Sequence, residues 1–117
     1  MRGNARIELG WMVETPVIPK TGAKILLNLV MVAFDALVRG GRLDVGVERG
    51  EVVVRAEGPR IVLDAEIRGV LAGGQGAVTS RTSAAWLTRH LAEEEGGSLS
   101  LADGEAGVLL LGATLPR

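Results

Sequence analysis

The chain begins with a stretch in which apolar and polar side chains alternate. In residues 6–13 large apolar side chains occupy all the odd positions, and the charged residues Arg6 and Glu8 occupy even positions. A two-residue period of this kind is typical of a β-strand that buries one face. Ile7, Leu9, Trp11 and Val13 share one face, and Trp11 is expected either in the core or at an interface.

The same period recurs in later segments that are separated by residues favouring turns. Turns are expected at Arg49-Gly50, Gly58-Pro59 and Asp103-Gly104, because glycine and proline suit the backbone angles of tight turns. With the first segment this predicts about six strands, of which the last two form a hairpin. The later segments are residues 42–48, 51–57, 60–68, 98–102 and 107–115.

A helical period replaces this alternation in two places. The first predicted helix runs from about Gly22 to Val38, with Thr21 as its N-cap. Nearly all of its side chains are apolar, so we expect it to be buried over most of its circumference. Gly40 and Gly41 end it.

A second helix is predicted from about Ser83 to Glu95. It follows a glycine-rich segment, residues 69–78, that is expected to be a loop, either without helix or with one short helical turn. Either Ser80 or Thr82 would serve as its N-cap. Gly96-Gly97 ends it. The expected buried face consists of Ala84, Leu87 and Leu91.

The predicted order of elements is β-α-β-β-β-α-β-β. This order favours a two-layer α/β sandwich, in which two main helices cover one face of a mixed, mostly antiparallel sheet. A length of 117 residues fits a single domain, residues 1–117, with a real hydrophobic core.

Composition and charge exclude several classes of protein. Hydrophobic residues make up 47% of the chain and charged residues 23%, which is typical of a globular protein and not of a disordered one. The net charge of −1 gives no electrostatic reason to expect nucleic acid or an acidic membrane as a partner. Without cysteine the chain has no disulfide and no thiolate site.

Neither a membrane span nor a signal peptide is expected. The longest unbroken apolar run, Leu29 to Phe34, is far too short to cross a bilayer. The first ten residues lack the apolar core of a signal peptide. We therefore expect a cytoplasmic protein.

One polar seam interrupts the apolar surface of the first helix. On a helical wheel at about 100° per residue, its members fall within a sector of roughly 60°. Spacing alone is compatible with a strip that faces solvent or with a binding site. The seam consists of Lys24, Asn28, Asp35 and Arg39.

Two segments resemble the GHKL (Bergerat) ATPase fold of histidine-kinase catalytic domains. "ILLNLVMVAFDALVRGGRLDVGV", residues 25–47, resembles the asparagine-bearing helix and the strand that follows it. "SAAWLTRHLAEEEGGSLSL", residues 83–101, resembles the last helix, its Gly-Gly stop and the next strand. The two segments come in the family's order, and the resemblance covers most of the chain from Lys20 to about Leu111.

The residues that would bind ATP in that family are missing. Asn28 matches the first of two asparagines, but Val32 stands where the second would bind Mg²⁺. Residues 63–76 contain no Asp-x-Gly-x-Gly box, whose aspartate reads adenine, because Asp64 lies in the predicted strand. Residues 78–86 replace the Gly-x-Gly-Leu turn that approaches the phosphates, and the ATP lid is absent. The resemblance therefore implies a domain without ATP, metal or another cofactor.

This combination is similar to the ChpT-like histidine phosphotransferases of bacterial phosphorelays, whose C-terminal domain resembles a kinase ATPase domain that has lost ATP binding. That family also has an N-terminal helical hairpin, which forms a dimeric four-helix bundle and carries the phosphoacceptor histidine. The resemblance implies phosphate transfer from a hybrid histidine kinase to a response-regulator receiver domain. This chain resembles the C-terminal domain only, and the helical-hairpin domain is expected to be absent from it.

On this resemblance we expect a domain without catalytic residues of its own that helps dock a response-regulator receiver domain. A homodimer is left open, and the residues first expected to contact a partner are those of the seam. Two alternatives remain. In a divergent GHKL ATPase or kinase fragment, Asn28 and Asp35 would have to replace the missing boxes. An unrelated α/β domain would serve assembly through its apolar helix.

His90, the only histidine, is the remaining candidate for chemistry. An imidazole can carry a phosphoryl group, but "RHLAEEE" does not follow the usual pattern of phosphoacceptor helices. We expect His90 on the helix surface, paired with Glu94 one turn further on. The acidic run Glu93–Glu95 diverges around the helix and is not expected to bind a metal.

Overall fold

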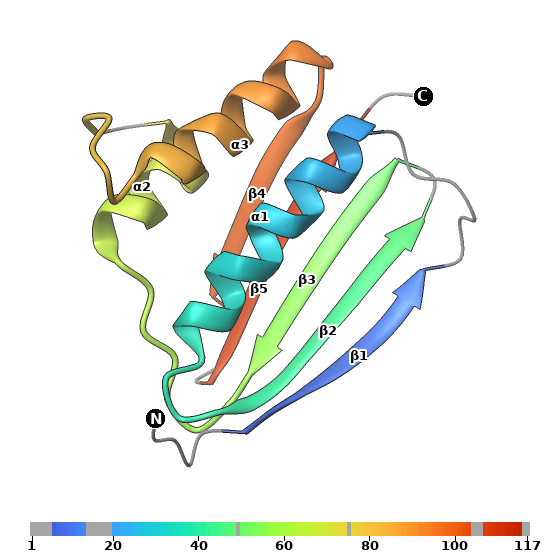
Figure 1. The fold of residues 1–117 in the computed structure, drawn as a ribbon, viewed down its shortest axis with the longest axis vertical. Coiled ribbons are helices and arrows are strands. Elements are labelled where there is room, and N and C mark those ends of the chain that lie inside the picture. The colour runs from blue at the N-terminus through green and yellow to red at the C-terminus, as the bar shows by residue number, and fades with distance from the viewer. Residues whose placement is uncertain (1–5, 14–19, 49, 75, 104–106, 116–117) are drawn as a thin grey trace.

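The computed structural model describes residues 6–13, 20–48, 50–74, 76–103 and 107–115. The chain forms two layers, a five-stranded sheet and three helices that lie across one of its faces (Figure 1). The elements along the chain are β1 (Ile7–Val13), α1 (Lys20–Ala36), β2 (Gly41–Glu48), β3 (Glu51–Glu57), α2 (Ala65–Gly73), α3 (Ser83–Glu94), β4 (Ser98–Asp103) and β5 (Val108–Thr114).

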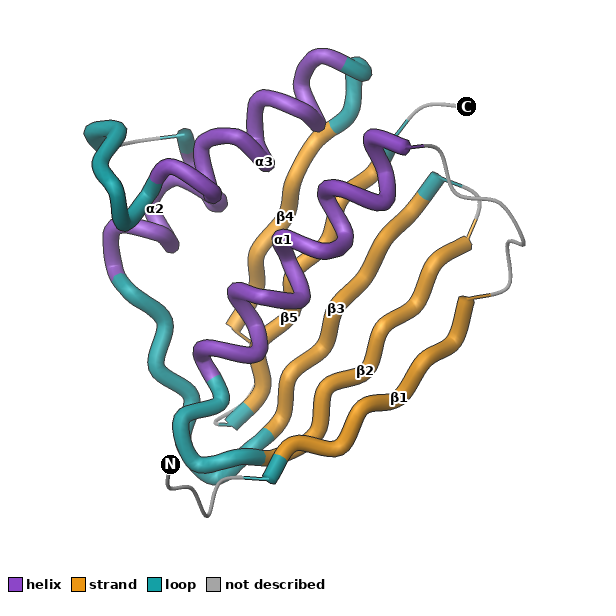
Figure 2. The backbone as a smooth tube through the Cα atoms, in the orientation of Figure 1, coloured by secondary structure: helices purple, strands orange, loops and turns teal. Residues whose placement is uncertain are grey.

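The sheet is mixed and has the strand order β1-β2-β3-β5-β4 (Figure 2). β1 pairs with β2 in parallel, and the pairings β2–β3, β3–β5 and β4–β5 are antiparallel. Parallel neighbours need a crossover connection, which α1 supplies between β1 and β2. The predicted two-layer sandwich with a mostly antiparallel sheet is confirmed, with five strands in place of about six.

The core lies between α1 and the middle of the sheet. On β2 the odd-numbered residues from Leu43 to Val47 are buried, as the alternation predicted. α1 contacts β3 and β5 and touches β2, while α3 packs beside it. The fully buried large side chains include Ile25, Leu29, Leu43, Leu71, Leu109 and Leu111.

The ends of α1 differ from those predicted. The helix begins at Lys20, so Thr21 lies within its first turn and is not the N-cap. After the helix, Gly40 and Gly41 have φ values of +80° and +140°, which residues with side chains rarely adopt. A Cβ on Gly40 would also collide with the backbone of Arg6. This close crossing of two chain segments explains the predicted Gly-Gly stop.

The strand predicted for residues 60–68 is wrong. A loop leads into α2 there, with Asp64 as the N-cap. The Asp64 carboxylate accepts the backbone N–H groups of Glu66 and Ile67, at 2.8 and 3.2 Å, and this favours a helical turn over an extended chain. α2 continues into the segment predicted as a loop and ends at Gly74, whose φ of 66° stops the helix.

α3 has nearly the predicted bounds, but its buried face is rotated by one position. Leu87, predicted to be buried, is 51% exposed. Thr88 is buried instead, because its hydroxyl donates to the Ala84 carbonyl oxygen at 2.8 Å and leaves no unmet hydrogen bond. The buried side chains of α3 are Ala85, Thr88 and Ala92.

Leu9 and Trp11 of β1 point to the helix side of the sheet but are not covered there. Leu9 pairs in register with Leu43, and Trp11 with Val45, whose side chains are buried beneath the helices. Leu9 and Trp11 are nevertheless 60% and 55% exposed. α1 crosses the sheet nearer its centre and leaves β1 bare (Figure 1). Of the two places expected for Trp11, the core and an interface, the structure thus excludes the core of this domain.

Candidate functional site

The structure brings two of the four seam residues into contact. Lys24, Asn28 and Asp35 lie on α1, and Arg39 lies beyond its end, in the turn before β2. The Asn28 side-chain Nδ2 donates to the Lys24 backbone carbonyl oxygen at 3.0 Å. Asn28 is half-buried, whereas the other three residues are exposed. The seam thus presents charged groups to solvent, an arrangement suited to contact with the surface of another protein.

Val32 is part of the hydrophobic core and not of a ligand site. Its side chain is half-buried and packs against the core cluster. Asn28, one turn earlier, hydrogen-bonds to its own helix. Val32 therefore offers no oxygen of the kind that a hard cation such as Mg²⁺ requires, and the hydrogen bond of Asn28 uses its side-chain nitrogen.

The connection from β3 to α2 contains a segment that we compare with the kinase adenine box, with Gly58 set on its first glycine. β3 ends at Glu57, and the spacing Asp-x-Gly-x-Gly falls on Ala56-x-Gly58-x-Arg60. Ala56 is fully buried, and its methyl group cannot accept a hydrogen bond from adenine. This position escapes a search of the sequence because residues 60–68 resemble a strand, which moves the expected box downstream. The sign available in the sequence was Gly58, which follows Ala56, the last buried residue of β3, by two positions.

Gly58 serves the packing of the chain at this connection. A Cβ there would collide with the Gly40 carbonyl oxygen and would lie 3.0 Å from Leu37 Cδ2. The Gly58 N–H donates to the Gly107 carbonyl oxygen at 2.9 Å. The fold thus requires this glycine whether or not a nucleotide is bound nearby.

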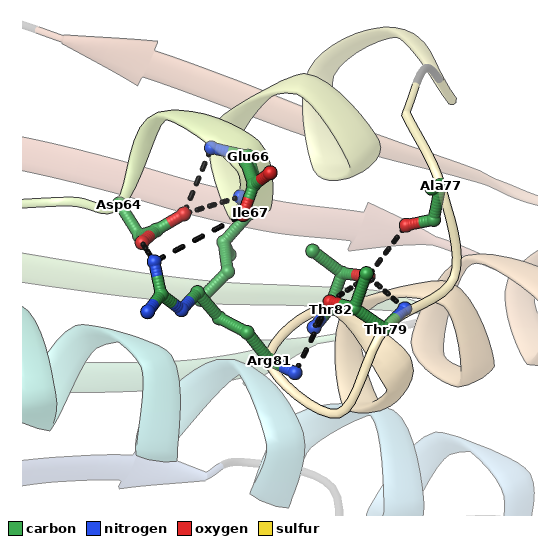
Figure 3. Close-up of polar contacts among 7 residues, drawn as sticks. All are labelled: Asp64, Glu66, Ile67, Ala77, Thr79, Arg81 and Thr82. Carbon is green, nitrogen blue, oxygen red and sulfur yellow. Dashed lines mark hydrogen bonds and ion pairs between the residues drawn. The ribbon is translucent and has the colours of Figure 1, made fainter.

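Arg81 ties the start of α2 to the segment before α3 (Figure 3). Its guanidinium lies 3.1 Å from the Asp64 carboxylate and 3.9 Å from that of Glu66. The pKa of the Asp64 carboxyl lies below its ordinary value, first because the carboxylate accepts the Ile67 amide, then because of the Glu66 amide and Arg81. Asp64 is therefore a charged structural group.

The segment before α3 satisfies its own hydrogen bonds (Figure 3). The buried Thr82 hydroxyl accepts the Thr79 N–H at 2.9 Å and donates to the Ala77 carbonyl oxygen at 2.7 Å. The Thr79 hydroxyl oxygen accepts the N–H groups of Arg81 and Thr82, both at 3.2 Å. Trp86 Nε1 donates to Ala77 as well, at 3.2 Å. These backbone amides are bonded to side chains and are not directed at a phosphate.

Thr82 is one of the two residues predicted to cap α3. It occupies the N-cap position, but its side chain does not bond to the first amides of the helix. Its hydroxyl bonds instead to the preceding segment, through Thr79 and Ala77. The other candidate, Ser80, offers its carbonyl oxygen to the Ser83 hydroxyl at 3.4 Å.

His90 lies on the exposed surface of α3. Its Nε2 is 3.2 Å from a carboxylate oxygen of Glu94, the partner that helical spacing predicted. Among the described residues, no group of three His, Asp or Glu side chains is arranged to hold a metal ion. No helix in the described ranges is long and apolar enough to cross a membrane.

An open hollow of about 190 Å³ lies at the ends of β1, β2 and β3, away from the seam. Its lining consists of a glycine, three apolar residues and two glutamates, all from these strands. It contains none of the residues predicted to contact a partner. The lining residues are Met12, Gly46, Val47, Glu48, Glu51 and Val53.

The sequence matches one protein family over most of its length. The family is described as the histidine phosphotransferase C-terminal domain, and its model matches residues 1–107. No match was found among the curated proteins.

Several solved structures share the fold. A bacterial phosphotransferase superposes with a TM-score of 0.79 at 23% identity, covering 92% of this chain and 55% of its own. Full-length ShkA, in complex with AMPPNP, gives 0.66 at 22%, covering 94% and 25%. The cytoplasmic segment of the histidine kinase QseC gives 0.60 at 15%, covering 95% and 62%. At these identities the likeness shows the fold, and the chain spans about half the length of the phosphotransferase.

Proposed function

This chain belongs to the family of histidine phosphotransferase C-terminal domains, and from this premise we propose that it is a ChpT-like docking domain of a phosphorelay, working without ATP. A hybrid histidine kinase would phosphorylate a histidine that lies outside this domain. That histidine would pass the phosphoryl group to a response-regulator receiver domain. The domain would help hold the receiver beside the histidine.

One observation carries the proposal: the positions that serve ATP in the kinases this chain resembles hold groups unsuited to it. Val32 packs into the core in place of the second asparagine, and buried Ala56 stands at the adenine-reading aspartate. The amides before α3 are bonded to Thr79 and Thr82. The scaffold of α1, α3 and the sheet is intact, which supports a role in binding a protein.

The first test is nucleotide binding. We expect titration with a fluorescent ATP analogue and Mg²⁺ to give no saturable signal, because the metal ligand and the adenine acceptor are missing. A histidine-kinase catalytic domain with both asparagines serves as the positive control. Saturable binding at micromolar concentration that Asn28→Ala abolishes would contradict the proposal and favour a divergent GHKL ATPase.

The second test concerns the seam as the docking surface. We expect Lys24→Glu and Asp35→Lys each to weaken binding of the relay's receiver domain by roughly 3- to 10-fold, because exposed charges at an interface contribute about 1 kcal/mol. Isothermal titration calorimetry measures the Kd. Glu95→Lys, at the exposed end of α3, makes the same charge change as Asp35→Lys and should leave the Kd unaltered. Equal losses in Asp35→Lys and Glu95→Lys would exclude the seam.

A further inference from the structure

β1 is an edge of the sheet whose outer side is open along the described residues. β2 lies on one side of it, and no described strand lies on the other (Figures 1 and 2). The Arg6 carbonyl accepts the N–H of Gly41 at 3.0 Å, which fixes the hydrogen-bonding phase of the parallel pair. The even-numbered residues of β1 therefore bond to β2. The N–H and C=O groups of its odd-numbered residues, 7 to 13, point away from the sheet.

This edge lacks most of the features that usually protect an exposed strand. Natural edge strands avoid pairing with other chains by means of charged side chains (especially lysines), proline, bulges or a covering helix, and of these β1 has only the charge of Glu8. Between Ile7 and Val13 there is no proline and no basic residue, and the register with β2 is continuous. At the opposite edge of the sheet, α2 and α3 both contact β4.

Three large apolar side chains along this edge are exposed. Leu9 and Trp11 are two positions apart and lie on the helix-facing side of the strand. Both side chains are more than half exposed. Met12, on the opposite side, is exposed too. Burial of large apolar and aromatic side chains supplies most of the free energy of protein association. The strand thus offers both unpaired backbone groups and apolar surface.

The one charged side chain on the strand already has a partner. Arg42 of β2 lies 3.7 Å from Glu8 and 3.0 Å from Asp44. The Asp44 carboxylate lies over Gly10, where a Cβ would collide with it. The middle of the edge therefore presents bare backbone beside a group of paired charges.

From these features we infer that a second copy of this chain pairs with β1, antiparallel and about a two-fold axis at Gly10. Gly10 is the midpoint of Ile7–Val13, so this register gives every outward backbone group a partner. It places Leu9 opposite the partner's Trp11, an aliphatic–aromatic pair on one face. Glu8 falls opposite the partner's Met12, so no like charges face each other.

A second copy is preferred over an extended segment of another protein because this register pairs the exposed Leu9 with the partner's exposed Trp11 and separates the two Glu8 side chains. The net charge of −1 adds little repulsion between two copies. The inference does not rest on the proposed function, because β1 contains none of the seam residues. If the receiver domain did not bind at the seam, the β1 dimer would be unaffected. If the β1 dimer did not form, the docking proposal would be unaffected.

Sedimentation equilibrium of the 117-residue chain tests the contact. We expect the mean mass to rise towards that of a dimer as the concentration increases from micromolar to near-millimolar. Leu9→Lys and Trp11→Lys should remain monomeric, with circular dichroism confirming their fold. Leu27→Lys makes the same change on the exposed face of α1 and should dimerise normally. A monomeric wild type, or a Leu27→Lys variant that dissociates as fully as Leu9→Lys, would overturn the inference.

Amide hydrogen exchange, resolved by residue with NMR, tests the same contact without a mutation. The amides of Leu9 and Trp11 should exchange slowly at high concentration and faster by roughly an order of magnitude on dilution. Those of Glu8 and Gly10, which bond to β2, should stay slow throughout. Unprotected exchange of Leu9 and Trp11 at every concentration would mean that the edge is free, and the inference would fail.

Discussion

At the scale of single residues, Asp64 decides the course of the chain between β3 and α2. Its carboxylate bonds to the amides of Glu66 and Ile67, in the first turn of α2, and to Arg81, which lies ahead of α3. One side chain thus starts a helix and links it to a distant segment. A hydrogen bond from a backbone amide to a charged carboxylate is among the stronger kinds, so this residue should matter to stability.

The pH dependence of stability should report this role. Because the pKa of Asp64 is lowered in the folded state, that state binds a proton less readily than the unfolded chain does. The contribution of Asp64 to the stability of the fold is therefore present above the ordinary aspartate pKa of about 3.9. It is lost as the pH falls below that value. Asp64→Ala should lower the Tm at pH 7 by several degrees, and the difference from wild type should shrink in acid.

Thermal unfolding, followed by circular dichroism, measures this difference in Tm at neutral pH and again at the lowest pH at which the protein stays soluble. Asp64→Asn is the matched variant, because asparagine also caps helices but cannot form the ion pair with Arg81. It should fall between wild type and Asp64→Ala at pH 7. A difference between wild type and Asp64→Ala that does not change with pH would show that the charge of Asp64 is irrelevant.

At the scale of elements, α2 is a short helix that depends on its neighbours. Nine residues are too few for a stable isolated helix, so its ends must be held by other groups. Asp64 holds the start. At the end, Arg89 of α3 donates to the carbonyl oxygens of Val70 and Leu71, at 3.4 and 3.3 Å, and pairs with Glu93 at 3.1 Å.

Loss of the Arg89 contacts should therefore destabilise the domain. Arg89→Met keeps much of the aliphatic stem, and we expect it to lower the free energy of unfolding by about 1–2 kcal/mol, since two carbonyl groups lose a charged donor. His90→Ala removes an exposed pair with Glu94 and should cost less than about 0.5 kcal/mol. Urea unfolding compares the two variants. Equal effects would show that Arg89 does not support α2.

The element boundaries also explain what could be predicted from the sequence. β2, β3, β4 and β5 are recognisable because each buries one face, which produces a two-residue period. Residues 60–68 have the same period by coincidence, and there the cap at Asp64 overrides it. The aspartate and the glutamate two residues later were the available signs of a helix start. The position of the adenine box escapes prediction for the same reason.

At the scale of the whole molecule, the two layers can be predicted from the sequence, but the contacts between distant segments cannot. The resemblance to histidine phosphotransferases is confirmed, because its two motifs lie on α1, α3 and the adjoining strands, which make up the scaffold. The exposure of Leu9 and Trp11 depends on where α1 crosses the sheet. Such contacts join distant segments, and local periodicity carries no information about them.

The pairing of β3 with β5 has a consequence for the newly made chain. β5 is the last described strand, yet it lies inside the sheet, and all of α2, α3 and β4 is synthesised between it and β3. Until β5 leaves the ribosome, β3 is an open edge with three consecutive valines, Val52–Val54. A stop codon ahead of residue 108 would thus remove an inner strand, and the truncated product would be prone to aggregate.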